Sequence, residues 1–198
     1  MEGNWKVKHM NDKIQLGREE IICLLQDLGD RLLEKGVYAQ MYIYGGAVIC
    51  AEYQLRETTF DIDCIYTDDN IRQQAEIIAK KRNIQQDWLN YAVAEIVFED
   101  MYRQDKPIRE VRFGALTISI PTARQLLAMK LFSARLGISN DLDDAYKLAV
   151  SLEIKTQYQL RSLLLEYFKK ESVIKRNKYE KNVIGRFINT LVERLSKL

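Results

Sequence analysis

The sequence contains a single histidine, His9, and only three cysteines, Cys23, Cys50 and Cys64, among its 198 residues. One histidine excludes His-rich metal sites and leaves almost no basis for a His-based catalytic triad. No two cysteines form a CxxC pair, which argues against a zinc knuckle or a redox motif. Each cysteine lies in an apolar run, which predicts small buried side chains in a reducing compartment. Any chemistry must therefore rest on carboxylates, lysines and arginines.

The sequence also lacks long apolar runs and has only two prolines. No stretch approaches 18 consecutive apolar residues, so we expect no transmembrane helix and no membrane partner. The first residues lack the apolar core of a signal peptide, which predicts a cytoplasmic protein. The formal net charge of +2 neither requires nor excludes a nucleic-acid partner.

Hydrophobic residues make up 47% of the chain and charged residues 29%, as in an ordinary globular protein that can bury a sizeable core. Apolar spacing and caps predict a mixed α/β half over residues 1–121 and a helical half over residues 122–198, an α+β fold. The predicted helices are 19–35, 47–55, 68–83, 121–137, 141–152, 156–170 and 178–197, and the predicted strands are 39–44, 58–67 and one or two within 111–121. Asp68 or Asp69, Thr122, Asp141 and Thr156 are the expected caps at helix starts, with Gly137 ending the 121–137 helix.

Asp61 and Asp63 stand out in the stretch YGGAVICAEYQLRETTFDIDCIY (44–66). In a strand, residues two apart point to the same face, so the two carboxylates project together. They repel each other unless a cation lies between them, and Mg²⁺ commonly binds one or two carboxylates together with substrate phosphates. The alternative is a solvated strand end with two ordinary surface aspartates, although apolar residues continue on both sides of the pair.

Gly45 and Gly46 strengthen the first interpretation. A strand, two glycines and a helix bring free backbone N–H groups together, and the missing Cβ atoms leave room for phosphate. The alternative is a tight strand-to-helix turn, which would need only one glycine. A phosphate-binding turn beside a Mg²⁺-binding pair is what nucleotide chemistry requires.

The pattern GG, helix, R-x-x-T-x-D-I-D resembles the signature of the DNA polymerase β-type nucleotidyltransferase superfamily in its minimal bacterial form. The matching residues are Gly45, Gly46, Arg56, Thr59, Asp61 and Asp63. The stretch 116–150 is similar to part of the abortive-infection nucleotidyltransferase toxins and their uncharacterised relatives, with Lys130, Arg135, Asp141 and Asp144 as matches. DWLN (87–90) resembles a motif of one uncharacterised subgroup, and together the resemblance covers about residues 20–170.

This resemblance implies a small mixed sheet flanked by helices, with the glycines on the first strand-helix turn and the aspartates on the next strand. It implies transfer of a nucleoside monophosphate from an NTP to an acceptor, with release of pyrophosphate. Asp61 and Asp63 would bind Mg²⁺, and Gly45 and Gly46 the triphosphate. Arg56 and Thr59 belong to the same nucleotide-binding motif, Lys130 would meet a phosphate or the transition-state charge, and Asp144 is a further candidate catalytic residue.

The sequence does not identify the acceptor, which could be a tRNA 3′ end or other RNA, a protein hydroxyl or a small molecule. The same resemblance raises the possibility of a toxin with a cognate antitoxin. A basic run at 169–186 can be interpreted as a surface that follows an RNA backbone or, more commonly, as a solvated helix face.

The chain departs from the family in its third carboxylate, which active members take from a later strand to bind a second metal ion or act as general base. Glu95, Glu99 and Glu110 are candidates by position, and Tyr91 stands where the DWLN subgroup tends to have an acidic residue. Without a third carboxylate the protein would bind nucleotide without fast turnover, or use Asp141 or Asp144 instead.

Several of these residues have structural alternatives. Lys130 can be a lysine at the edge of a core, and Asp141 can be a helix N-cap. Asp144 can be a salt-bridge partner of Lys147 or Arg135. Arg56 can be a charge at the end of a helix. Trp88 fits the core better than a base-stacking platform.

At the level of the whole protein, the alternatives are a degenerate nucleotide-binding or protein-interaction module and a nucleotide-sugar glycosyltransferase. The glycosyltransferase reading explains the aspartates but not the glycines. A haloacid-dehalogenase-type phosphatase is disfavoured because its nucleophilic aspartate belongs on the first strand.

Overall fold

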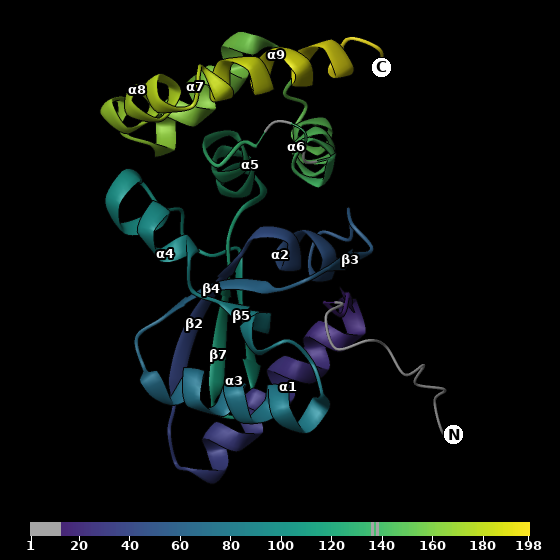
Figure 1. The fold of residues 1–198 in the computed structure, drawn as a ribbon, viewed down its shortest axis with the longest axis vertical. Helices are drawn as coiled ribbons and strands as arrows, with labels where there is room; N and C mark the ends of the chain where they lie inside the picture. Colours follow the sequence, from purple (N-terminus) through teal and green to yellow (C-terminus); the bar gives the residue numbers. More distant parts are fainter. Residues whose placement is uncertain (1–12, 136, 138) are drawn as a thin grey trace.

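The computed structural model describes residues 13–135, 137 and 139–198, so His9 lies outside the described residues. The fold is α+β: a mixed five-stranded sheet with helices, followed by a run of helices at the C-terminal end (Figure 1). The sheet has the strand order β5-β4-β2-β7-β6, with β2 (Ala39–Tyr44), β4 (Ile62–Tyr66), β5 (Leu89–Asn90), β6 (Arg109–Phe113) and β7 (Leu116–Ile120). A separate two-stranded sheet joins β1 (Leu16–Gly17) to β3 (Thr58–Thr59).

The central strand β2 runs antiparallel to β4 on one side and parallel to β7 on the other. The edge strand β5 pairs in parallel with β4, and β6 forms an antiparallel hairpin with β7. The helices α1 (Arg18–Glu34) and α3 (Asp69–Arg82) contact each other and lie against the sheet, while α2 (Gly45–Ala51) lies between the sheet and the C-terminal helices (Figure 1). The ends of β2 and β4 nearest α2 therefore face the helical part of the molecule.

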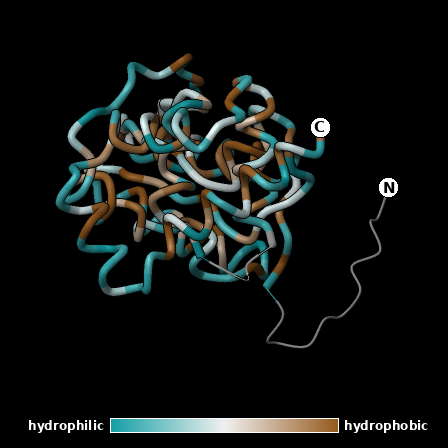
Figure 2. Tube along the Cα trace, turned by 90° about the horizontal axis from the view of Figure 1, so that it is seen from above, coloured by the Kyte–Doolittle hydropathy of each residue, from teal (hydrophilic) through white to brown (hydrophobic). Residues whose placement is uncertain are grey.

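The helical part consists of α5 (Ala123–Phe132), α6 (Ser139–Ser151), α7 (Gln157–Tyr167), α8 (Lys170–Tyr179) and α9 (Val183–Leu195). Between β5 and β6 the chain forms the short helix α4 (Val93–Glu95), which continues as one π-helical turn (Ile96–Asp100). Hydrophobic segments gather toward the middle of the molecule and hydrophilic segments toward its outside (Figure 2). No helix in the described part of the chain is long and apolar enough to cross a membrane.

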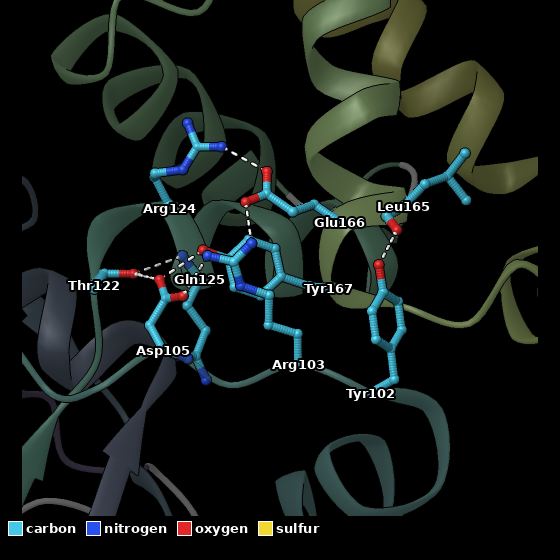
Figure 3. Close-up of polar contacts among 9 residues, drawn as sticks. All are labelled: Tyr102, Arg103, Asp105, Thr122, Arg124, Gln125, Leu165, Glu166 and Tyr167. Carbon is cyan, nitrogen blue, oxygen red and sulfur yellow. Dashed lines mark hydrogen bonds and ion pairs between the residues drawn. The ribbon is translucent and has the colours of Figure 1, made fainter.

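A polar network joins the segment after the π-helical turn to α5 and α7 (Figure 3). The carboxylate of Asp105 accepts hydrogen bonds from the hydroxyls of Thr122 and Tyr167, both at 2.6 Å. Glu166 forms ion pairs with Arg103 at 2.5 Å and with Arg124 at 2.7 Å. The loop before the β6–β7 hairpin is thereby tied to two helices of the C-terminal run.

Local signals predicted several elements correctly. The helix α1, the strand β2 and the helix α3 lie where the sequence placed them, and Asp68 caps α3 by accepting a hydrogen bond from the Asn70 N–H at 2.8 Å. Thr122 and Thr156 likewise accept hydrogen bonds from backbone N–H groups at the starts of α5 and α7. The sequence predicted one or two strands within 111–121, and the segment belongs to two strands, β6 and β7.

Other predicted boundaries were wrong. The strand predicted over 58–67 is divided into β3 and β4, with Asp61 in the gap between them. The helix that begins at the glycines ends at Ala51, and the chain then turns through a left-handed residue, Gln54 (φ 53°). The helix α5 ends at Phe132, and Gly137 (φ 84°) lies in the following loop instead of closing the helix.

The C-terminal part also differs from its prediction. Asp141 lies within the first turn of α6 instead of capping it, and the segment from 170 to the end forms two helices, α8 and α9, with left-handed Lys181 and Asn182 between them. Cys50 and Cys64 are buried as predicted, whereas Cys23 is exposed.

Candidate functional site

Asp61 and Asp63 come together although only Asp63 lies in a strand. Asp63 pairs across the sheet with Tyr44, the last residue of β2, and Asp61 directly precedes β4. The side-chain nitrogen of Asn90 on β5 lies 3.2 Å from one oxygen of each carboxylate. One amide group therefore touches both aspartates, so the two carboxylates converge on the same point, as the sequence predicted.

The pair carries an excess of negative charge. Removal from water, and then the charge of Asp61, raise the pKa of Asp63 to about 6, an effect that Lys130 and Arg135 oppose only in part. A carboxylate whose charged form is disfavoured gains from a nearby cation, and oxygen donors of this kind suit Mg²⁺. Within the described residues, no group of three or more His, Cys, Asp or Glu side chains is arranged to hold a metal ion. The aspartates thus fit a divalent cation that takes its remaining ligands from water or from a substrate.

Both glycines are required by the side chains of this same site. Gly45 has a left-handed backbone (φ 64°), and a Cβ atom on it would lie 2.1 Å from the Oδ2 atom of Asp63. A Cβ atom on Gly46 would lie 2.7 Å from the Thr59 hydroxyl and 2.8 Å from the Arg56 guanidinium. The structure brings all six residues of the GG/R-x-x-T-x-D-I-D pattern into one cluster, and it gives a packing reason for two glycines where a simple turn needs one.

A continuous chain of ion pairs lies beside this cluster. Arg56 contacts Asp144 at 3.1 Å, and the Lys130 ammonium contacts Asp144 at 2.9 Å. Lys130 also contacts Asp141 at 3.0 Å, and Asp141 contacts Arg135 at 2.8 Å. These five residues link the turn after α2 with α5, the loop after it and α6.

The chain of ion pairs is buried except at its Arg135 end, where the side chain is 61% exposed. Asp141 and Asp144 are 4% and 2% exposed. Burial alone would raise the pKa of Asp141, but hydrogen bonds from Arg135 and Lys130, together with their charges, hold that pKa below its ordinary value. The Lys130 side chain is only 13% exposed and ends between two carboxylates, so it is a member of a buried charge network and not a lysine that reaches from the core into water.

The structure also corrects the expected partners of Asp144. Asp144 pairs with Arg56 and Lys130, whereas Lys147 donates to the Leu55 carbonyl and Arg135 pairs with Asp141. The Arg56 side chain likewise points to Asp144 and to the Thr58 carbonyl. Trp88 is fully buried, and its indole N–H donates to the Ala75 carbonyl at 3.0 Å, which confirms the prediction that it belongs to the core.

A cavity of about 200 Å³ lies between Asp63 and two of the cations, Lys130 and Arg135. Gly45 and Asp63 line it on the sheet side, and Lys130, Arg135 and Asp141 on the helical side. The remaining lining residues, mostly apolar, come from the α4 segment and α5: Ala92, Val93, Ile96, Leu126, Met129 and Ser133. The cavity thus places an acidic group opposite positive charge, within apolar walls.

None of the proposed third carboxylates lies with the pair. Glu110 is on β6, where it accepts hydrogen bonds from Gln40 and Ser119, and Glu95 and Glu99 are exposed on the α4 segment. Tyr91 packs its ring against Tyr66, with ring centroids 5.0 Å apart. The position beside Asp63 belongs to Asn90, which the sequence reasoning missed; its signal was the DWLN motif, whose last residue is the register partner of Asp63.

Comparison of the chain with protein-family models, with curated proteins and with solved structures finds no match. The evidence for function therefore comes from the site itself.

Proposed function

We propose that this protein is a Mg²⁺-dependent nucleotidyltransferase of the minimal nucleotidyltransferase fold, which transfers a nucleoside monophosphate from an NTP to an acceptor. The observation that carries the proposal is the convergence of Asp61 and Asp63, because Asp63 lines a cavity that Lys130 and Arg135 also line. A metal-triphosphate complex has the complementary arrangement, because it presents a cation to the carboxylates and phosphate oxygens to the basic side chains.

In this proposal Asp61 and Asp63 hold the metal ion, which supplies charge neutralisation at the phosphates when it is bound. Lys130 and Arg135 provide positive charge for the triphosphate across the cavity. Gly45 and Gly46 hold the turn against Asp63, Thr59 and Arg56, which gives the cluster its shape. Asp141 pairs with Lys130 and Arg135, and Asp144 pairs with Lys130, so that the positive charges are in place before substrate arrives. Such preorganised charge is most of what phosphoryl-transfer chemistry requires from a protein.

The reaction forms a bond between an acceptor oxygen and the α-phosphorus and breaks the bond from that phosphorus to the bridging oxygen, releasing pyrophosphate. The acceptor proton is lost to solvent or to a base that the site does not identify. A tRNA 3′ end or other RNA, a protein hydroxyl and a small molecule are all compatible acceptors. A cytoplasmic toxin controlled by an antitoxin remains the biological setting that the sequence resemblance suggests.

Thermal unfolding with each of the four NTPs, with and without Mg²⁺, tests the proposal. Wild type should show a Mg²⁺-dependent rise in Tm with at least one NTP, because a ligand that binds only the folded state stabilises it. Asp63→Asn should lose this rise. Asp87→Asn is the matched control, since that carboxylate is 62% exposed and pairs only with Lys13 among the described residues. No rise with any NTP at millimolar concentration would reject the proposal.

One observation favours a second candidate, a nucleotide-binding module without fast turnover. Asn90 stands beside Asp63 where a third carboxylate would complete a catalytic set. The two candidates separate when the NTP found by thermal shift is supplied with a label on its α-phosphate, together with total RNA, cell protein and a small-molecule cell extract as acceptors. Label transfer that Asp61→Asn abolishes supports the enzyme, and binding without transfer supports the module.

A further inference from the structure

Asn90 is held in a fixed place between the two aspartates. It lies on β5 as the register partner of Asp63, and its carbonyl oxygen accepts a contact from the Cys64 thiol at 3.6 Å. Two residues earlier in the chain, Trp88 anchors this strand in the core through its hydrogen bond to the Ala75 carbonyl. The Asn90 side chain therefore has little freedom to move away from the carboxylates.

All polar groups of the Asn90 amide are in use. Its nitrogen donates to Asp61 Oδ2 and to Asp63 Oδ1, both at 3.2 Å, and its oxygen accepts from the Ala92 backbone N–H at 3.0 Å. The opposite orientation of the amide would turn its oxygen toward two carboxylates and its NH₂ group toward a backbone donor. Only one orientation thus satisfies every hydrogen bond, and it presents donors to the aspartates.

The charge of the pair follows from this arrangement. Asp61 and Asp63 supply two negative charges, and the neutral amide adds none. A carboxylate at the same position would bring a third charge and a further oxygen ligand, which is what a site for two adjacent metal ions needs. Two carboxylates and an amide donor match the charge of one divalent cation.

We infer that Asn90 is a positioning residue that holds Asp61 and Asp63 ready for a single divalent cation and restricts the site to that one ion. The inference rests on the proposed metal-binding function of the pair and adds the number of ions and the residue that sets it. It also accounts for a polar residue other than a carboxylate beside Asp63.

A Mn²⁺ titration monitored by electron paramagnetic resonance tests the inference. Mn²⁺ favours the same oxygen ligands as Mg²⁺. The signal of the free ion gives both the affinity and the number of Mn²⁺ sites. Wild type should bind one Mn²⁺ per chain, and Asp63→Asn should not bind it. Asn90→Ala should weaken Mn²⁺ binding about 10- to 100-fold, as the loss of a residue that orients metal ligands does. Asn90→Asp, nearly identical in shape, should bind two Mn²⁺ per chain.

Asn189→Asp is the control for added negative charge, because Asn189 is exposed on α9 and its side chain hydrogen-bonds only Gln157 among the described residues. It should retain one site of unchanged affinity, and circular dichroism of each variant should match wild type. Unchanged affinity in Asn90→Ala, or a single site of wild-type affinity in Asn90→Asp, would overturn the role of Asn90 and leave the proposed function standing. Absence of Asp63-dependent Mn²⁺ binding in wild type would overturn the proposed function first and this inference with it.

Discussion

Asp63 shows how the site opposes the stability of the fold. Its pKa of about 6 in the folded protein exceeds the value of about 4 for a free aspartate, because the carboxylate is removed from water and faces Asp61. The folded state therefore holds this proton more tightly than the unfolded state. The resulting stabilisation is present below pH 4 and is lost as the pH rises through 6.

Asp63→Asn should consequently stabilise the ligand-free protein at pH 8 and have little effect at pH 4. After allowance for solvent around a partly buried group, we expect a gain of about 1–2 kcal/mol at pH 8, since one unit of pKa corresponds to about 1.4 kcal/mol. Urea unfolding of both proteins in metal-free buffer at the two pH values measures it. A variant that is less stable than wild type at pH 8 would show that the charged form of Asp63 is satisfied in the fold.

Gly45 is the residue whose substitution most directly disturbs the pair. Gly45→Ala should lower the free energy of unfolding by about 2–3 kcal/mol, because it combines a left-handed backbone with a contact of 2.1 Å to Asp63. Gly36→Ala is a matched control, since Gly36 has almost the same φ (67°) and nothing within 4 Å of the added atom. Chemical denaturation of both variants isolates the contact, and equal losses in the two would mean that Asp63 moves aside freely.

At the scale of elements, the predictable features were those with local causes. Asp68 and Thr122 start α3 and α5 through hydrogen bonds to residues two or three positions later, which a sequence pattern contains. The contacts of Asp141 and Asn90 have no such local signal. Asp141 bonds Lys130 from another helix, and Asn90 bonds Asp63 across 27 positions of the chain. The pairing of β5 with β4 brings DWLN beside the aspartates, and this strand order is visible only in the folded structure.

The ion pairs that join α5 and α6 to the turn after α2 should behave as one unit. Lys130→Met leaves Asp141 and Asp144 buried with one cation each, so we expect a loss of about 2–4 kcal/mol. Adding Asp144→Leu to Lys130→Met removes one of the two carboxylates that lost an ion-pair partner and should cost less than the sum of the single changes. A double-mutant cycle by urea unfolding gives the coupling energy, and additive losses would argue against a connected network.

At the scale of the whole molecule, the question is whether the predicted division into residues 1–121 and 122–198 describes two parts that unfold separately. The ion-pair chain crosses this boundary, and so does the Asp105 network (Figure 3). Hydrogen bonds from Thr122 and Tyr167, with the charge of Arg103, outweigh burial and hold the pKa of Asp105 below its ordinary value. The stability that Asp105 contributes is therefore present above pH 4 and is lost as the pH falls through the lowered pKa.

We expect one cooperative transition at pH 7, with the same midpoint by tryptophan fluorescence and by far-ultraviolet circular dichroism. Both tryptophans, Trp5 and Trp88, belong to residues 1–121, so their fluorescence reports on the α/β half, and the dichroism signal is weighted toward the helices. Asp105→Ala should lower both midpoints together and reduce the free energy of unfolding by about 1–3 kcal/mol, because it leaves the Tyr167 hydroxyl without its hydrogen-bond acceptor at 2.6 Å. Tyr167→Phe removes the same hydrogen bond without an unpaired hydroxyl on the tyrosine side and should cost less. If only the dichroism midpoint fell, the C-terminal helices would be a separately folding unit. The contacts across the boundary between residues 121 and 122 would then not couple the aspartate site to those helices.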